Sequence, residues 1–276
     1  MPFSELKLGD MTIPLHWYEW GSGEQTPLLL LHGFMGHGAT WEPIARALSD
    51  NHYVVAPDLP FHGQSRFPED DVTPEITFET VARGLQRWIG EQFSIPLAVV
   101  GYSMGGRLAL YLAAHDNDLF SRLVLESASP GILTEKERRK RRESDRELAE
   151  QLLTSDFEAF LHSWYQAPMW GHIQAHPNYP ELLRTRQEND PHQLALALRV
   201  LGTGNQPPVW KHLPEIRQPV LLLAGEYDAR YIHIMDTMRR QLPFAEFQAV
   251  ADCGHNIHFE RPELFIKLVR NFLKGK

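Results

Sequence analysis

The sequence predicts an α/β fold: a mostly parallel, open sheet covered by helices on both faces, with an all-helical lid inserted between two strands. Short apolar runs alternate with stretches of helical periodicity through most of the 276 residues, which is the rhythm of βαβ units. That rhythm stops between residues 127 and 211, where no strand-like run occurs. We therefore expect a core domain of residues 1–126 and 212–276 and a helical lid of residues 127–211.

The predicted strands are short apolar runs bounded by Gly, Pro or Asp, as is typical of central strands in a parallel sheet. They cover residues 27–32, 52–56, 96–101, 122–126 and 219–224, with a more exposed strand at 244–250. The first 20 residues alternate in polarity around Gly9-Asp10 and predict a hairpin. Core helices are expected at 40–49, 77–92, 104–115, 232–241 and 262–273, and lid helices at 135–153, 157–164, 181–188 and 192–201.

The composition excludes several classes of protein. A net charge of −8 argues against general nucleic-acid binding. No apolar run approaches the roughly 20 residues that span a bilayer, and no secretory signal is visible, so we expect no membrane insertion. The single cysteine, Cys253, rules out an internal disulfide, and a cytoplasmic location fits best. No His/Cys cluster has the spacing of a metal site, and no obligate protein partner is evident.

Residues 101–105 read Gly-Tyr-Ser-Met-Gly and match the pattern G-x-S-x-G. The pattern stands between a predicted strand and a predicted helix, which is the setting of a nucleophile elbow. A serine needs a base, and the base needs an orienting acid. In elbow proteins these follow in the order acid, then histidine, so we expect Asp228 and His255 to complete a triad with Ser103.

Other residues compete for these roles or support them. Glu226 and Asp252 are weaker candidates for the acid, and His258 is expected to be a packing or surface histidine. An oxyanion site needs two backbone N–H donors, which we expect from Phe34 and Met104. His32 is expected to be structural, bonded within its own loop.

Arg107 lies one helical turn after Ser103 and should project from the same helix face. A cation in the first turn opposes the helix dipole, so some partner must compensate. One alternative is a salt bridge to an acid such as Asp58, and the other is a carboxylate of the substrate. The run Lys-Glu-Arg-Arg-Lys-Arg-Arg at 136–142 in the lid is mostly a solvated helix face, from which one or two arginines could point inward.

Several motifs together carry a resemblance that spans nearly the whole chain. His-Gly-Phe-Met-Gly (32–36), the elbow, Gly-Glu-Tyr-Asp (225–228) and Gly-His-Asn-Ile-His (254–258) resemble the α/β-hydrolase superfamily. Within it, the lid segments 126–146 and 160–170 closely resemble the 2-succinyl-6-hydroxy-2,4-cyclohexadiene-1-carboxylate synthase family of menaquinone and phylloquinone biosynthesis. One departure is Phe61, where many relatives have glycine, and it affects no catalytic residue.

The resemblance implies a lyase that eliminates pyruvate from an enolpyruvyl substrate, with the triad serine acting as a base and no cofactor. The substrate is a small molecule with three carboxylates. The family's carboxylate-binding arginines match Arg107, Arg141 and Arg186, although Arg184 is close enough to compete with Arg186. Further pocket positions match Tyr102, Trp164 and Tyr165.

Two other functions remain open at this point. The same triad would serve a hydrolase of esters, or of carbon–carbon bonds in acidic diketones. A ligand-binding role without catalysis is the third hypothesis, and an intact triad beside an oxyanion loop argues against it.

Overall fold

Eight strands form one sheet in the computed structural model, which describes residues 2–68, 72–93 and 96–275. The strands are β1 Phe3–Leu8, β2 Met11–Trp20, β3 Thr26–Leu31, β4 His52–Pro57, β5 Leu97–Tyr102, β6 Phe120–Glu126, β7 Val220–Gly225 and β8 Ala245–Val250. Their order is β1-β2-β4-β3-β5-β6-β7-β8. β1 and β2 form the predicted hairpin, β2 is antiparallel to β4, and all pairs among β3 to β8 are parallel. The predicted mostly parallel sheet is confirmed.

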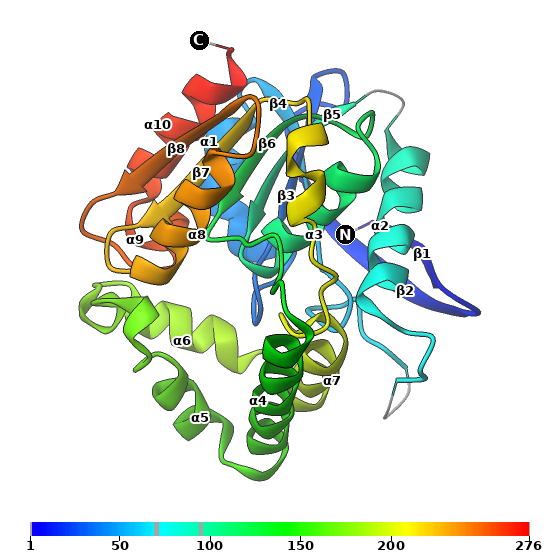
Figure 1. Cartoon of the computed structure of the whole chain (residues 1–276), viewed down its shortest axis with the longest axis vertical. Helices are drawn as coiled ribbons and strands as arrows, with labels where there is room; N and C mark the ends of the chain where they lie inside the picture. Colours follow the sequence, from blue (N-terminus) through cyan, green and yellow to red (C-terminus); the bar gives the residue numbers. More distant parts are fainter. Residues whose placement is uncertain (1, 69–71, 94–95, 276) are drawn as a thin grey trace.

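Helices cover both faces of this sheet (Figure 1). On one face α2 (Phe78–Gln92), α3 (Met104–His115) and α8 (Ala229–Arg239) share a continuous core with the strands. On the other face α1 (Glu42–Leu48) and α10 (Pro262–Leu273) bury a second core. Every residue of β5 and β7 is buried, which explains why these strands read as unbroken apolar runs.

The helix boundaries differ from the prediction in two places that have clear causes. The helix expected at 40–49 begins as a 3-10 turn, η1 (Gly38–Trp41), before α1. Pro43 lacks an N–H and fits only the first turn of an α-helix, so α1 starts at Glu42. α8 begins three residues earlier than expected because the side chain of Asp228 accepts a hydrogen bond from the Tyr231 N–H and caps the helix.

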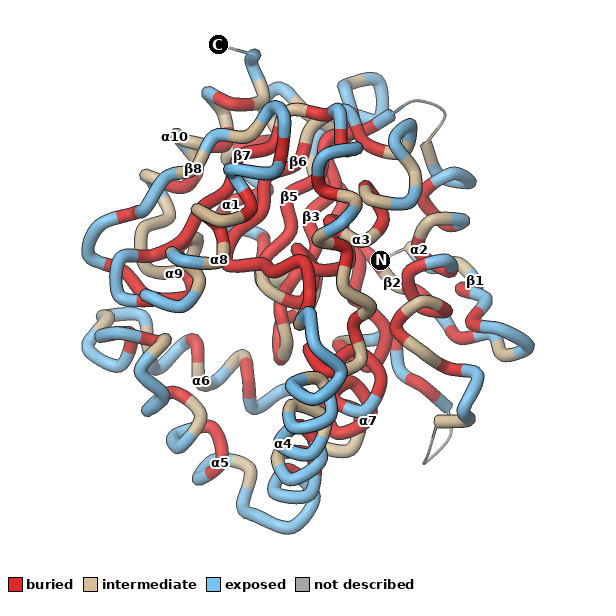
Figure 2. Tube along the Cα trace, in the orientation of Figure 1, coloured by how far each residue is buried: buried red, intermediate tan, exposed pale blue. Residues whose placement is uncertain are grey.

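Between β6 and β7 the described chain contains helices and no strand, as predicted. The lid helices are α4 Glu135–Thr154, α5 Phe157–Trp164, α6 Tyr179–Gln187 and α7 Pro191–Leu201, with short 3-10 turns η2 Pro168–Trp170, η3 Ile173–Ala175 and η4 Trp210–Glu215. The four α-helices and the turns η2 and η3 gather at one end of the molecule, whereas η4 packs against α3 of the core (Figure 1). Figure 2 shows that the central strands are buried while α4 is largely exposed. The boundaries proposed for the lid as a domain remain a prediction.

Candidate active site

Ser103 stands in the turn that joins β5 to α3. Its backbone has φ 47° and ψ −105°, a region that non-glycine residues rarely occupy and that costs free energy. Its N–H donates to the carbonyl oxygen of Glu126 on β6 at 2.8 Å. The turn therefore holds the serine in a strained conformation at the carboxyl end of the parallel strands.

Two glycines of the motif are required by close backbone contacts. A Cβ on Gly101 would lie 2.6 Å from the Cα of Gly106, and a Cβ on Gly105 would lie 2.3 Å from the carbonyl oxygen of Leu31. Both distances are shorter than any side chain tolerates. The G-x-S-x-G pattern thus follows from how closely α3 packs on β3 and β5.

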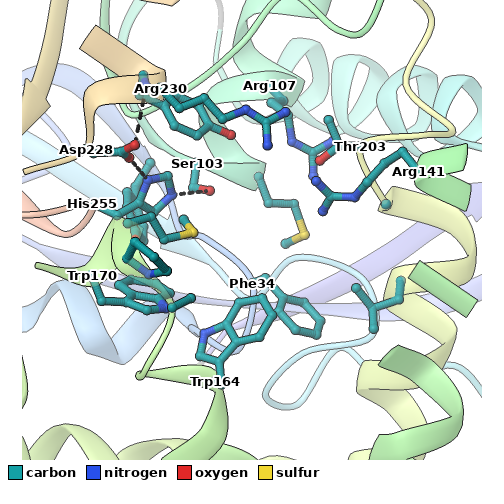
Figure 3. A pocket seen from close by; sticks show the side chains of 18 of the residues that line it. Phe34, Ser103, Arg107, Arg141, Trp164, Trp170, Thr203, Asp228, Arg230 and His255 are labelled. Atoms are coloured by element: carbon teal, nitrogen blue, oxygen red, sulfur yellow. Dashed lines mark hydrogen bonds and ion pairs between the residues drawn. The ribbon is translucent and has the colours of Figure 1, made fainter. Parts of the chain in front are cut away.

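The three expected triad residues form one hydrogen-bonded chain (Figure 3). His255 Nε2 lies 3.0 Å from Ser103 Oγ, and His255 Nδ1 lies 2.6 Å from Asp228 Oδ2. Asp228 and His255 are buried, with 1% and 2% of their surfaces exposed. This geometry allows the serine proton to move to the imidazole while the carboxylate holds the ring in place.

The two competing carboxylates are engaged elsewhere. Glu226 accepts a hydrogen bond from the Asp252 N–H at 3.1 Å, and Asp252 pairs with Arg261 at 3.2 Å. Neither is hydrogen-bonded to His255. The structure therefore favours Asp228 as the orienting acid.

The two expected oxyanion donors flank the serine. In the described part of the chain, neither the Phe34 nor the Met104 N–H donates a hydrogen bond to a loop or side-chain acceptor, and both residues line the cavity at Ser103. His32 supports this loop: its Nε2 accepts the Leu59 N–H, and its Nδ1 contacts the Gly33 carbonyl, both at 2.8 Å. Burial holds the pKa of His32 well below its ordinary value, so the ring is neutral and structural, as predicted.

Arg107 is buried, and among the described residues its guanidinium bonds only to neutral groups. Its Nη2 donates to the carbonyl of Leu201 at 2.7 Å, and its Nη1 donates to Gln206 Oε1 at 3.4 Å. The alternative salt bridge to Asp58 is wrong, because Asp58 accepts instead from the backbone N–H groups of Gly38 and Gln64. Burial lowers the pKa of Arg107 to about 10, which leaves it charged at neutral pH.

One arginine of the basic lid run turns toward the serine, within the range predicted. Arg141 lines the cavity, and its Nε donates to Asp145 Oδ1 at 2.7 Å. Arg138 and Arg142 instead pair with Glu135 on the same helix. The partial engagement of Arg141 leaves the rest of its guanidinium facing the cavity (Figure 3).

A cavity of about 400 Å³ joins these groups. Its lining consists of Phe34, Tyr102, Ser103, Met104, Arg107, Arg141, Trp164, Ala167, Pro168, Met169, Trp170, Ala197, Leu198, Leu201, Gly202, Thr203, Tyr227, Asp228, Ala229, Arg230, Tyr231 and His255. The triad, both oxyanion donors, Tyr102, Trp164 and two of the three expected arginines therefore meet in one place.

Arg186 and Tyr165 do not line this cavity, which departs from the expected substrate contacts. Arg186 is 5% exposed, and its Nη1 donates to the carbonyl of Met35 at 2.9 Å. Its Nε donates to the hydroxyl of Tyr165 at 3.2 Å. Arg186 thus connects α6 to the oxyanion loop and to Tyr165 at the end of α5. The physical reason is burial, because its donors are satisfied by protein oxygens. Arg184, its competitor, lies exposed between Glu181 and Glu188.

Comparison with known proteins supports the fold and narrows the family. Residues 26–262 match the family model described as alpha/beta hydrolase fold. A 2-succinyl-6-hydroxy-2,4-cyclohexadiene-1-carboxylate synthase from Photorhabdus laumondii is 30% identical over 92% of this chain and 87% of its own length. A Bacillus subtilis protein that carries the same name provisionally is 33% identical over 92% of both chains. The chain belongs to this synthase family of the α/β hydrolases.

A longer plant protein and two solved structures extend the comparison. The Arabidopsis thaliana protein PHYLLO is 29% identical over 91% of this chain, which spans only 16% of that longer protein. The structure of MenH from S. aureus superposes with a TM-score of 0.84 at 32% identity, covering 94% of this chain and 97% of that one. A malate-bound esterase from Thermogutta terrifontis has a TM-score of 0.81 at 26% identity, covering 99% and 98%.

Sequence reasoning missed some residues at this synthase-family site. Trp170 meets His255 edge-on, with ring centroids 5.4 Å apart. Arg230 and Tyr231 line the cavity from the first turn of α8. The signal available for them was their position, two and three residues after the acid and at the same sheet edge.

His258 packs against other rings, one of the two roles expected for it, and it also contacts a buried carboxylate. Its Nδ1 contacts Glu126 Oε2 at 2.7 Å, its backbone N–H donates to Glu126 Oε1, and its ring stacks on Trp41 at 4.2 Å. Residues 132 positions apart in sequence meet here, so no local pattern could have paired them.

Two kinds of feature are absent from residues 2–68, 72–93 and 96–275. No group of three or more His, Cys, Asp or Glu side chains is arranged to hold a metal ion. None of the helices combines the length and apolar character that crossing a bilayer requires.

Proposed function

We propose that this protein eliminates pyruvate from 2-succinyl-5-enolpyruvyl-6-hydroxy-3-cyclohexene-1-carboxylate and yields 2-succinyl-6-hydroxy-2,4-cyclohexadiene-1-carboxylate. The observation that carries the proposal is Arg107, a buried cation beside Ser103 that has no carboxylate partner in the described chain. Membership of the synthase family supports the same reaction. The pathway would be that of menaquinone or phylloquinone.

Ser103 acts in this proposal as a base. The ring C–H next to the succinyl ketone is acidic because its conjugate base is an enolate. Ser103 Oγ takes this proton while its own proton passes to His255 Nε2, 3.0 Å away. Asp228 stabilises the resulting imidazolium at Nδ1.

The enolate oxygen accepts hydrogen bonds from the N–H groups of Phe34 and Met104. These donors are already in place before negative charge develops on the oxygen. When the enolate collapses, the C–O bond to the enolpyruvyl group breaks and a ring double bond forms. The departing pyruvate enolate takes up one proton, which His255 can return through Ser103. Atoms and charge therefore balance without a metal or an organic cofactor.

The negative charge of the proposed substrate gives a reason for the arginines that line the cavity. The proposed substrate carries three carboxylates, and Arg107 and Arg141 present guanidinium groups to the cavity. A desolvated contact between arginine and carboxylate contributes about 1.5–3 kcal/mol. The esterase relative that holds malate, a dicarboxylate, supports anion binding on this fold.

The test is to supply the enolpyruvyl substrate and to follow the absorbance of the conjugated cyclohexadiene product together with pyruvate release. We expect release by the wild-type protein and a loss of several orders of magnitude in Ser103→Ala. Ser144→Ala, an exposed serine on α4, is the matched control. Absence of pyruvate above background with folded wild-type protein would contradict the proposal.

Ester hydrolysis is the second candidate, because the same triad can attack a carbonyl carbon and an esterase is among the structural relatives. The two reactions differ in what forms at Ser103. Rapid turnover of short acyl esters with a trapped acyl-serine, detected by mass spectrometry, would favour the hydrolase.

A further inference from the structure

One wall of the cavity concentrates positive charge. Figure 3 shows Arg230, Arg107 and Arg141 along the same side of the pocket, with Phe34 and Trp164 on the opposite side. The lining contains one carboxylate, Asp228, which is already committed to His255. A ligand in this cavity therefore meets three guanidinium groups and no free acid from the lining.

The three arginines differ in how many hydrogen bonds their guanidinium groups already make within the protein. Arg107 is bonded to two neutral oxygens, and Arg141 is bonded to Asp145. Arg230 is exposed and makes no hydrogen bond or ion pair within the described residues. Its donors are the most available of the three.

The position of Arg230 in the backbone does not favour a positively charged side chain. It is the second residue of α8 (Ala229–Arg239), two positions after the triad acid. Positive charge near a helix N-terminus is unfavourable, whereas a bound anion there is stabilised by the helix dipole and by the arginine. A carboxylate in the cavity would remove this conflict.

We propose that Arg230 binds a carboxylate of the substrate and sets the specificity of the cavity for tricarboxylates. This inference rests on the proposed function and adds a third arginine to the two named there. Arg186, the residue expected for that contact, is held by Met35 and Tyr165 outside the lining. Arg230 supplies the third cation that a substrate with three carboxylates requires.

The kinetic test compares Arg230→Gln and Arg230→Lys with Arg239→Gln, an exposed arginine on the same helix that pairs with Asp236. With the enolpyruvyl substrate, Arg230→Gln should raise KM about 10- to 100-fold and change kcat far less, while Arg230→Lys should recover part of the loss. Arg239→Gln should match wild type. An unchanged KM in Arg230→Gln, or equal losses with a neutral acyl ester, would overturn the inference.

A binding test separates this inference from the proposed reaction. Citrate, a tricarboxylate, is titrated calorimetrically into each folded protein, with acetate as the comparison ligand. Arg230→Gln should weaken citrate binding by at least several-fold, and Arg239→Gln should not. If wild type released no pyruvate but showed this difference, the reaction would be wrong and the anion contact right. If wild type bound citrate no better than Arg230→Gln, the contact would be wrong whatever the reaction.

Discussion

The Nδ1 atom of His258 lies 2.7 Å from Oε2 of Glu126, a carboxylate with no exposed surface. The same carboxylate accepts the His258 N–H, and the Glu126 carbonyl accepts the Ser103 N–H. Glu126 thereby joins the serine turn to the segment that follows His255. A substitution there should disturb the fold and the site together.

We expect Glu126→Gln to lower the free energy of unfolding by about 1–3 kcal/mol, because it leaves buried donors without a charged acceptor. Urea unfolding measures the change. Glu263→Gln, at an exposed position on α10, is the control and should be close to neutral. Equal stability of the two variants would show that the buried pair contributes nothing.

The backbone conformation of Ser103 should lower the free energy of unfolding while it supports catalysis. Its positive φ is costly for serine and not for glycine. We expect Ser103→Gly to be more stable than Ser103→Ala by about 1 kcal/mol, while both lose pyruvate release. Thermal unfolding of the two variants provides the comparison, and a less stable glycine variant would contradict stored strain.

Arg107→Gln should separate the two candidate reactions. It removes the cation from the cavity, so turnover of the tricarboxylate should fall about 10- to 100-fold or more, while a neutral ester should be affected much less. Steady-state kinetics on both substrates measures the split, with the exposed Arg83→Gln as a control. Equal losses on both substrates would mean that Arg107 is only structural.

Gly105 and Gly90 should respond oppositely to the same substitution. Gly105→Ala places a Cβ 2.3 Å from the Leu31 carbonyl, so we expect a loss of several kcal/mol or failure to fold. Gly90 lies in α2 with open space around it, and Gly90→Ala should stabilise by about 0.5–1 kcal/mol. Chemical denaturation of both variants tests the pair; similar effects would refute the packing explanation.

Glu260 should make stability depend on pH. Burial raises its pKa to about 7, against hydrogen bonds from the backbone that lower it. Because the folded pKa exceeds the unfolded value, the stability it contributes is full at acidic pH and is lost as pH rises through about 7. The free energy of unfolding of wild type minus that of Glu260→Gln should therefore decrease from pH 5 to pH 8. A difference that is constant or increases would exclude this linkage.

The parts of the structure that local patterns determine were predictable. The elbow, the strand ends and the chain order of the triad are each encoded within a few residues, so Ser103, Asp228 and His255 could be proposed together. The direct packing of α3 on β3 and β5 requires Gly101 and Gly105, and these two glycines are what make the motif recognisable in the sequence.

The remaining features depend on contacts between distant segments. Arg184 and Arg186 lie two residues apart on α6, yet one is exposed and the other is buried against the oxyanion loop. That distinction depends on how α6 docks, which periodicity does not determine. The acid motif ends at Asp228 and gives no signal for Arg230, which the capped start of α8 places at the cavity.

The carbonyl of Met35 accepts hydrogen bonds from Arg186 and Asn189, about 150 residues further along the chain. Met35 follows Phe34, one of the expected oxyanion donors. During synthesis the first strands and the serine turn emerge well before these partners exist. The loop that should receive the developing negative charge thus acquires its last supports only after the ribosome has completed α6, so the early part of the chain alone would carry the serine without its finished anion-binding loop.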